Sequence, residues 1–238
     1  AVLTSTPTIT WLSQSLESPL QRLVCVVGPG GVGKTRLVAE AARMNLHLFP
    51  DGVFHVPLDS VHSADHLAEF IGRQVGLSFD GHQDARQTLA DYLRLRRLLL
   101  VLDNFEHLLD GRGLLVELLQ AAPLLKILVT SRERLHLQAE FIIELEGLPY
   151  QPELLPNEKW TDQSSLSRTH NPAVYLLLER AGRVRPGIIA PAEGNDDLSI
   201  SDPGELEGAM TICRLVDGLP LGLELAAGWA RDFSFAHI

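Results

Sequence analysis

Residues 28–35 read Gly-Pro-Gly-Gly-Val-Gly-Lys-Thr and match G-x-x-x-x-G-K-[ST], the pattern of a phosphate-binding loop (P-loop). Its glycines allow the backbone to wrap a phosphate with successive N–H groups pointing inward, and a following helix N-terminus adds partial positive charge. Lys34 would reach the β- and γ-phosphates, and the Thr35 hydroxyl would hold Mg²⁺. The alternative is a glycine-rich turn with an exposed lysine. The pattern predicts an ATP or ADP site with Mg²⁺, lined by Gly28, Gly30, Gly31, Val32, Gly33, Lys34, Thr35 and Arg36.

A carboxylate follows an apolar run further along the chain. Residues 98–102 are Leu-Leu-Leu-Val-Leu and Asp103 comes next, so a rigid strand would deliver one negative oxygen to the magnesium shell. The alternative for Asp103 is a cap on the following helix. Position 104, where many hydrolytic P-loop enzymes carry a second acid, holds Asn104, which cannot accept a proton at neutral pH. We therefore expect slow hydrolysis, or hydrolysis assisted by Glu106 or by a partner.

An arginine follows another apolar run. Residues 126–130 are Lys-Ile-Leu-Val-Thr, and Ser-Arg-Glu-Arg comes directly after them. At the carboxyl edge of a parallel sheet, Arg132 would point into the crevice where ligands bind, and its guanidinium suits a γ-phosphate. Arg134 is the competing candidate, and a surface arginine paired with a carboxylate is the alternative. We predict Lys34, Asp103 and Arg132 as the catalytic set, with Thr35 and Asp103 as the metal ligands.

Short apolar runs that alternate with amphipathic segments would position these residues, and this alternation predicts βαβ units with a parallel sheet. The predicted strands are 22–27, 53–57, 98–103, 126–130 and 141–145. Continuous apolar character in the first, third and fourth indicates burial on both faces. The predicted helices are 34–46, 64–75, 85–96 and 106–120. The fold class is therefore α/β, a P-loop sheet flanked by helices over residues 1–148.

The composition changes after residue 148, where prolines cluster at 149, 152 and 156 and a polar stretch, 157–171, reads as a loop. Helices are predicted at 172–183, at 205–216 and from Pro220 onward, and 185–203 reads as a loop because it lacks periodicity. Residues 149–238 are therefore predicted to form a small helical domain.

The composition of the 238 residues is that of a globular protein, with 45% apolar and 21% charged residues, which excludes wholesale disorder. The net charge of −10 and the lack of a Lys/Arg block argue against tight nucleic-acid binding by this segment. Apolar runs are too short for a membrane helix, and two cysteines make no disulfide framework, so we expect a cytoplasmic protein. Because the chain begins with Ala1, we also expect a fragment of a longer polypeptide.

Four ordered motifs resemble the NB-ARC type of STAND ATPase, and most of all the ATPase module of bacterial transcriptional regulators. They are the P-loop, Leu-Val-Leu-Asp-Asn-Phe-Glu-His at 100–107, Val-Thr-Ser-Arg at 129–132 and Gly-Leu-Pro-Leu at 218–221. The resemblance covers about residues 22–230. The Arg-containing motif that contacts the base in this family is not recognisable in residues 1–21.

The resemblance implies an AAA+-like signalling switch, locked off with ADP, on with ATP and forming oligomers on activation. It implies that Pro220 packs near the adenine, although a proline at the first turn of a helix has that position for structural reasons as well. It also implies winged-helix, sensor and output domains outside this segment, and residues 149–238 as the first helical subdomain of the family.

Two other classes of function compete with the switch: a turnover enzyme, which would be a motor ATPase or a small-molecule kinase, and a binding scaffold. A motor ATPase would be expected to carry an acid at position 104, and a small-molecule kinase needs an acceptor pocket and an arginine-bearing lid, for which the 185–203 loop offers only Arg183 and Arg185. A binding scaffold without nucleotide function is disfavoured because Lys34, Thr35 and Asp103 are intact. His62 and His66 lie four residues apart, but no third zinc ligand is evident.

Overall fold

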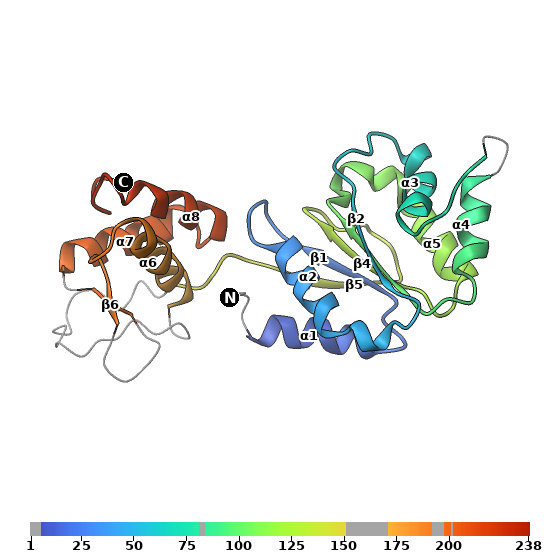
Figure 1. The fold of residues 1–238 in the computed structure, drawn as a ribbon, viewed down its shortest axis with the longest axis horizontal. Helices are drawn as coiled ribbons and strands as arrows, with labels where there is room; N and C mark the ends of the chain where they lie inside the picture. The colour runs from blue at the N-terminus through green and yellow to red at the C-terminus, as the bar shows by residue number, and fades with distance from the viewer. Residues whose placement is uncertain (1–5, 81–83, 151–170, 192–197, 201) are drawn as a thin grey trace. The chain divides into compact units, whose positions relative to one another are not determined.

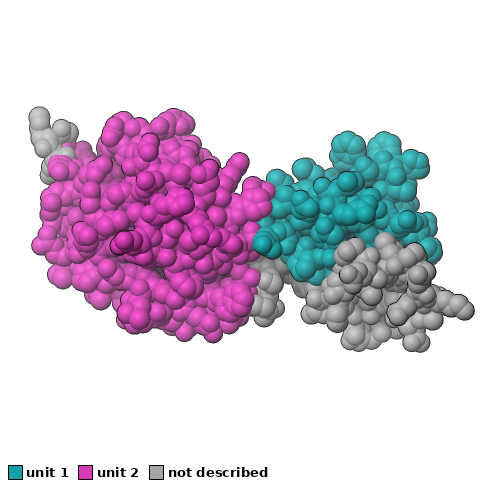
Figure 2. Space-filling view, turned by 180° about the vertical axis from the view of Figure 1, so that it is seen from behind, with its two compact units in different colours: residues 1, 31–33, 146–238 teal, residues 2–30, 34–145 magenta. Residues whose placement is uncertain are grey.

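The computed structural model describes residues 6–80, 84–150, 171–191, 198–200 and 202–238. Figure 2 colours its two compact units, residues 2–30 with 34–145 and residues 146–238 with 31–33. Almost all of the loop predicted at 157–171 lies outside the described residues. Within the part of the chain that is described, no helix has the length and apolar character needed to span a bilayer.

The larger unit is built on a parallel five-stranded sheet with the strand order β2-β3-β4-β1-β5. All five predicted strands are present, each with bounds within a residue of the prediction, and the predicted fold class is confirmed. The strands are β1 (Leu23–Val27), β2 (Val53–Pro57), β3 (Leu99–Asp103), β4 (Lys126–Ser131) and β5 (Glu140–Glu144).

Helices cover both faces of this sheet, with α1 and α2 on one face and α3, α4 and α5 on the other (Figure 1). Short 3₁₀ segments follow or precede some of the helices. The helices are α1 (Thr6–Glu17), α2 (Lys34–Met44), α3 (Leu67–Gln74), α4 (Ala85–Leu93) and α5 (Arg112–Ala121), and the 3₁₀ segments are η1 (Leu46–Leu48), η2 (Ala64–His66) and η3 (Phe105–Gly111).

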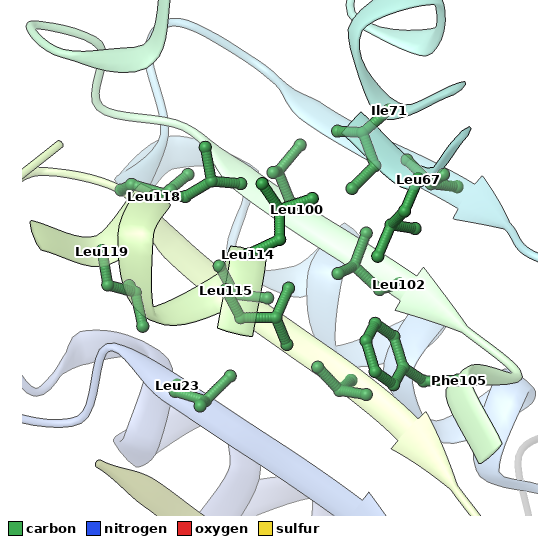
Figure 3. Close-up of a cluster of buried hydrophobic side chains, with 14 of the residues drawn as sticks. Leu23, Leu67, Ile71, Leu100, Leu102, Phe105, Leu114, Leu115, Leu118 and Leu119 are labelled. Atoms are coloured by element: carbon green, nitrogen blue, oxygen red, sulfur yellow. The ribbon is translucent and has the colours of Figure 1, made fainter. Parts of the chain in front are cut away.

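The central strands are buried on both faces, as their unbroken apolar sequences predict. Every residue of β1 and β3 is buried, and so are five of the six residues of β4. Figure 3 shows Leu100 and Leu102 of β3 in a cluster with Leu115 and Leu118 of α5. Cys25 of β1 belongs to the same core, and burial raises the pKa of its thiol above its ordinary value.

The helix predicted at 106–120 is not continuous. Leu108 has non-helical dihedral angles inside η3, and the α-helical part begins only at Arg112. A β-carbon at Gly111 would lie 3.1 Å from Leu67 Cδ2 and 3.2 Å from Ala64 Cβ. Close packing of η2 and α3 against this segment thus leaves little room for a side chain at 111.

Helix α1 is missing from the sequence prediction. Its residues include several Ser and Thr with weak helix propensity. Two tertiary features stabilise it: Leu12 and Leu16 are buried, and Lys126 Nζ donates to the backbone carbonyls of Ser15 (2.9 Å), Ser18 (2.6 Å) and Gln21 (3.2 Å). A lysine from β4 thus neutralises the carbonyl end of α1.

In the smaller unit lie α6 (Pro172–Val184), α7 (Pro203–Leu215) and α8 (Pro220–Trp229), at the places where the sequence predicts helices. The predicted 185–203 loop is wrong in part, because β6 (Ala190–Pro191) and β7 (Leu198–Ser199) pair there as a short antiparallel ribbon. Buried Glu205 accepts hydrogen bonds from Arg185 Nη1 (2.9 Å) and from the backbone N–H of Phe235 (2.7 Å), which fastens the segment after α8 to α7.

The contacts of Lys126 predict a measurable contribution to stability. Lys126→Met should lower the free energy of unfolding by about 2 kcal/mol, because three carbonyl oxygens lose a charged donor while the aliphatic packing is kept. Denaturant unfolding followed by circular dichroism measures the change. Arg43→Ala, which removes an exposed ion pair to Glu40 on α2, is the control and should leave the midpoint unchanged. A Lys126→Met midpoint equal to that of the wild type would contradict the capping role.

Candidate functional site

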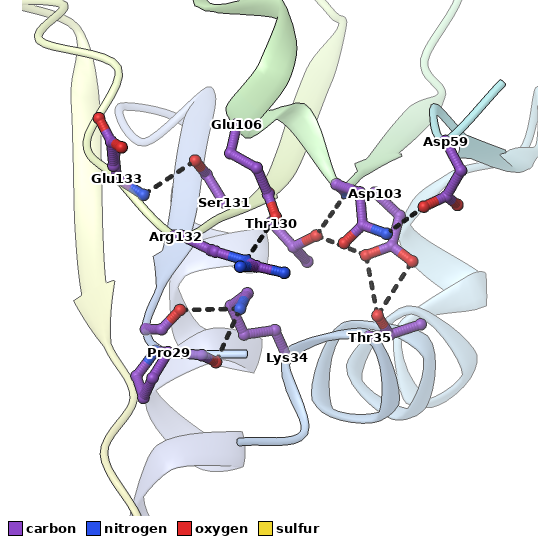
Figure 4. Close-up of polar contacts among 12 residues, drawn as sticks. Pro29, Lys34, Thr35, Asp59, Asp103, Glu106, Thr130, Ser131, Arg132 and Glu133 are labelled. Carbon is purple, nitrogen blue, oxygen red and sulfur yellow. Dashed lines mark hydrogen bonds and ion pairs between the residues drawn. The ribbon is translucent and has the colours of Figure 1, made fainter. Parts of the chain in front are cut away.

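Three strands bring the predicted residues to one edge of the sheet. β1, β3 and β4 run parallel, so their carboxyl ends lie at the same edge, and β4 lies between the other two. The P-loop follows β1 and Asp103 ends β3. The end of β4 therefore inserts Thr130, Ser131 and Arg132 between the P-loop and Asp103, as Figure 4 shows.

The P-loop has the backbone that its glycines permit. Gly31 and Gly33 have φ values of +77° and +100°, in the left-handed region that other residues rarely adopt. Lys34 Nζ donates to the carbonyl oxygens of Gly28 (2.8 Å) and Pro29 (3.0 Å), so the ammonium group lies folded back against the loop. Lys34 is buried at the start of α2, where a phosphate group would meet both its charge and the helix N-terminus.

The charges around Lys34 act in both directions. Burial lowers the pKa of Lys34 below its ordinary value, the carboxylate of Glu106 opposes this, the guanidinium of Arg132 lowers the pKa further, and Asp103 raises it. A bound anion would favour the charged ammonium of Lys34.

Asp103 connects three elements. Asp103 is only 4% exposed, and Thr35 Oγ1 on α2 lies 3.0 Å from both of its carboxylate oxygens. The hydroxyl of Thr130 on β4 donates to Asp103 Oδ1, and His55 Nε2 on β2 lies 3.6 Å from Oδ2. These contacts hold a buried carboxylate in one orientation at the strand end.

The hydroxyl of Thr35 and the carboxylate of Asp103 are suitable donors for Mg²⁺. They are hard oxygen ligands, and Mg²⁺ in nucleotide sites takes one or two protein oxygens together with phosphate oxygens and waters. The described ranges contain no group of three or more His, Cys, Asp or Glu side chains that could bind a metal ion without such help. The predicted metal residues thus lie together, in a form that fits a magnesium–nucleotide complex.

Asn104 has a left-handed backbone with φ +64°, a conformation that asparagine tolerates better than most residues. Its backbone N–H donates to Thr130 Oγ1 at 2.9 Å. Its amide Nδ2 donates to Asp59 Oδ1 at 2.6 Å, in the segment after β2. Asn104 therefore binds groups on the β2 and β4 sides of β3 and acts as a structural turn residue.

The two candidate arginines have different partners. Arg132 Nε lies 3.0 Å from Glu106 Oε1, and its guanidinium carbon would lie 3.6 Å from a β-carbon placed on Gly30 of the P-loop. Arg134 forms an ion pair with Glu144 at the end of β5. Arg132 is thus the arginine that lies against the P-loop.

The sequence analysis also considered Pro220, His62 and His66. Pro220 is in the first turn of α8, in the smaller unit, and its role toward adenine stays a prediction. His66 ends η2 while His62 precedes it, so the two do not share a helix. The sequence analysis did not single out Thr130 or Asp59, whose contacts depend on the order of the strands. Thr130 carries a weak signal, because it stands directly before the strand-end Ser-Arg pair.

Known proteins are similar to this chain in sequence and in fold. A sequence profile described as "AAA domain" matches residues 19–138. The chain is 36% identical over 214 residues to the Mycobacterium tuberculosis protein named "Putative HTH-type transcriptional regulator Rv0890c", covering 90% of this chain and 21% of that protein. The chain therefore spans about a fifth of the length of this relative.

Two solved structures have a similar fold. CDC6P from Pyrobaculum aerophilum aligns with a TM-score of 0.56 and 14% identity over 93% of this chain and 58% of that chain. The Aeropyrum pernix ORC2 protein, solved as ADPNP–ADP complexes, aligns with a TM-score of 0.56 and 13% identity over 93% and 61%. At these identities the likeness concerns the fold.

The left-handed turn at Asn104 predicts a difference between two substitutions. Asn104→Gly and Asn104→Val both remove the amide bond to Asp59, but only valine adds a β-branched side chain at positive φ. We expect the free energy of unfolding of the valine variant to be about 1 kcal/mol lower than that of the glycine variant. This difference already includes the larger chain entropy of glycine in the unfolded state. Urea titration of both variants measures this, and equal stability would show that the turn relaxes.

Proposed function

Because the chain belongs to the AAA-domain family, we propose that residues 1–148 bind ATP and ADP with Mg²⁺ and hydrolyse ATP slowly, as the nucleotide switch of a larger regulator. The observation that carries this proposal is the meeting of Thr35 Oγ1 with both carboxylate oxygens of Asp103, 3.0 Å away. A hydroxyl after the P-loop lysine and a strand-end carboxylate are the protein ligands of magnesium in P-loop nucleotide sites.

In the proposed site each residue has a separate task. The backbone of Gly28, Gly30, Gly31, Val32 and Gly33 would wrap the phosphates, and Arg36 would lie one residue beyond Thr35 in α2. Lys34 would leave its two loop carbonyls for the β- and γ-phosphates, because a charged oxygen is a better acceptor than a carbonyl. Thr35 and Asp103 would hold Mg²⁺, which neutralises phosphate charge when it is bound.

The residue at position 104 supports a switch over a fast motor. Its side chain is an amide, and that amide is bound to Asp59. An amide cannot take a proton from water at neutral pH, so hydrolysis would be slow and the ATP-bound state would persist. A persistent state can select one arrangement of a protein over another, which is how a nucleotide acts as a signal.

The relatives support a role within a larger protein. The M. tuberculosis relative is named as a transcriptional regulator, and this chain corresponds to about a fifth of it. We propose that the helical segment 149–238, with Pro220 toward the base, reports the nucleotide state to further winged-helix, sensor and output domains. Oligomer formation on activation, cytoplasmic location and the NB-ARC type of STAND mechanism belong to the same proposal.

Nucleotide release and titration test this function. We expect protein purified without added nucleotide to release close to one ADP per chain on denaturation, or to bind ATP and ADP in a Mg²⁺-dependent titration. Lys34→Ala should weaken ATP binding at least about tenfold, which corresponds to about 1.4 kcal/mol, because a charge at the phosphates is lost. Asp103→Asn should remove most of the Mg²⁺ dependence of binding.

Arg43→Ala is the matched control, since Arg43 lies on the same helix as Lys34 and its side chain is exposed and paired with Glu40. Its nucleotide affinity should equal that of the wild type. A wild-type chain that is folded, by circular dichroism, and binds neither ATP nor ADP contradicts the proposed function.

A further inference from the structure

A cavity of about 250 Å³ lies in the larger unit at the amino edge of the sheet. The end of α1, the turn from α1 to β1, the end of η1 and the residues that precede β3 and β4 surround it. These segments lie at the end of the sheet away from the P-loop (Figure 1). Because ligands of such sheets bind at the carboxyl ends of the strands, this amino-edge cavity is separate from the proposed nucleotide site.

Apolar side chains form much of the wall of the amino-edge cavity. Leu16, Phe49 and Leu125 line it and are otherwise buried in the protein, and Leu124 lines it with about half of its surface exposed. An apolar ligand would leave water on entering such a cavity, which favours binding. The volume lies below the range of about 300–1,000 Å³ that is usual for drug-sized ligands, so the occupant must be small.

Positive charge gathers around the same cavity. Arg22, Arg97 and Lys126 line it, and Glu17 is the one acid among the described residues that do so. This excess of cations is a local reversal in a chain whose net charge is −10. The like charges affect one another, because burial and then the charge of Arg97 lower the pKa of Lys126 to about 8. A bound anion would offset this repulsion.

The three cations differ in how far their donors are already used. Lys126 Nζ donates to the three carbonyls at the end of α1, and Arg22 Nη1 donates to the carbonyl of Ala122 at 3.0 Å. The backbone N–H of Arg97 donates to Asp51 Oδ2 at 2.7 Å, whereas its guanidinium forms no ion pair with any described residue. Arg97 thus offers its planar guanidinium, which matches a carboxylate with two parallel hydrogen bonds.

We propose that the amino-edge cavity binds a small apolar monocarboxylate, with the carboxylate on the guanidinium of Arg97 and the apolar body against the apolar wall. Arg22 and Lys126 contribute charge beside the carboxylate. A single negative charge suits the cavity better than a double one, because Glu17 faces the same space and repels anions. This site goes beyond the proposed nucleotide function and does not depend on it.

Calorimetric titration with three probes of matched shape tests the ligand class. Octanoate, octanamide and octylammonium have the same apolar chain and differ in the charge of the head group. We expect octanoate to bind with a dissociation constant of about 1 mM or lower. Octanamide should bind at least about tenfold more weakly, because it loses the charge-assisted hydrogen bonds, and octylammonium should bind more weakly still.

Three variants test the position of the site. Arg97→Gln changes an exposed side chain and should weaken octanoate binding at least about fivefold, with little preference left for octanoate over octanamide. Arg94→Gln is the matched control, because Arg94 is a nearby exposed arginine that pairs with Asp91 outside the cavity, and its octanoate affinity should equal that of the wild type. Lys34→Ala should also keep this affinity, since it changes only the P-loop. Circular dichroism confirms that each variant is folded.

Several results would overturn the site. Equal affinities for octanoate and octanamide, or equal losses of affinity in Arg94→Gln and Arg97→Gln, would remove the role of Arg97. Loss of octanoate binding in Lys34→Ala but not in Arg97→Gln would move the carboxylate to the P-loop, and tighter binding of octyl phosphate than of octanoate would contradict the monocarboxylate. A folded wild-type chain that binds no octanoate up to about 10 mM refutes the proposal, whether or not it binds nucleotide.

Discussion

The arrangement of the larger unit depends on the hydrogen bonds that the buried carboxylate of Asp103 needs. An ionised group taken out of water costs several kcal/mol unless hydrogen bonds replace its hydration. Here Thr35 comes from α2 and Thr130 from β4, so the replacement depends on three elements meeting at one edge. That meeting requires parallel strands with β4 between β1 and β3, which is the observed order. The hydrogen bonds that stabilise Asp103 in the site therefore depend on this order of the strands.

Steric limits on the backbone shape the site as strongly as charge does. A left-handed residue after β3 turns the chain into η3, and asparagine is among the few side chains that accept this φ. The turn directs the amide of Asn104 to Asp59 and brings Glu106 back toward Arg132. The positions of the acids at this edge of the sheet thus follow from one backbone conformation.

The sequence predicts the structure best in segments where the local pattern and the tertiary packing favour the same helix or strand. The buried strands needed unbroken apolar runs, and their bounds came out within a residue. It failed where packing overrides local preference. Helix α1 depends on buried Leu12 and Leu16 and on Lys126, which lies more than a hundred residues away in the chain. The predicted 106–120 helix breaks at Leu108, whose dihedral angles are not helical, and the α-helical part begins only at Arg112.

The sequence by itself determined the α/β class, the P-loop with its lysine and threonine, and the strand-end Asp103, because these depend on residue type and on spacing within one segment. Only the tertiary structure decided that Thr130 holds Asp103, that Arg132 and not Arg134 lies against the P-loop, and that Glu106 has one oxygen without a partner. The physical reason is that these contacts join residues on different strands. Which side chains meet there depends on strand order and on backbone dihedral angles, and neither is encoded in the spacing of any single motif.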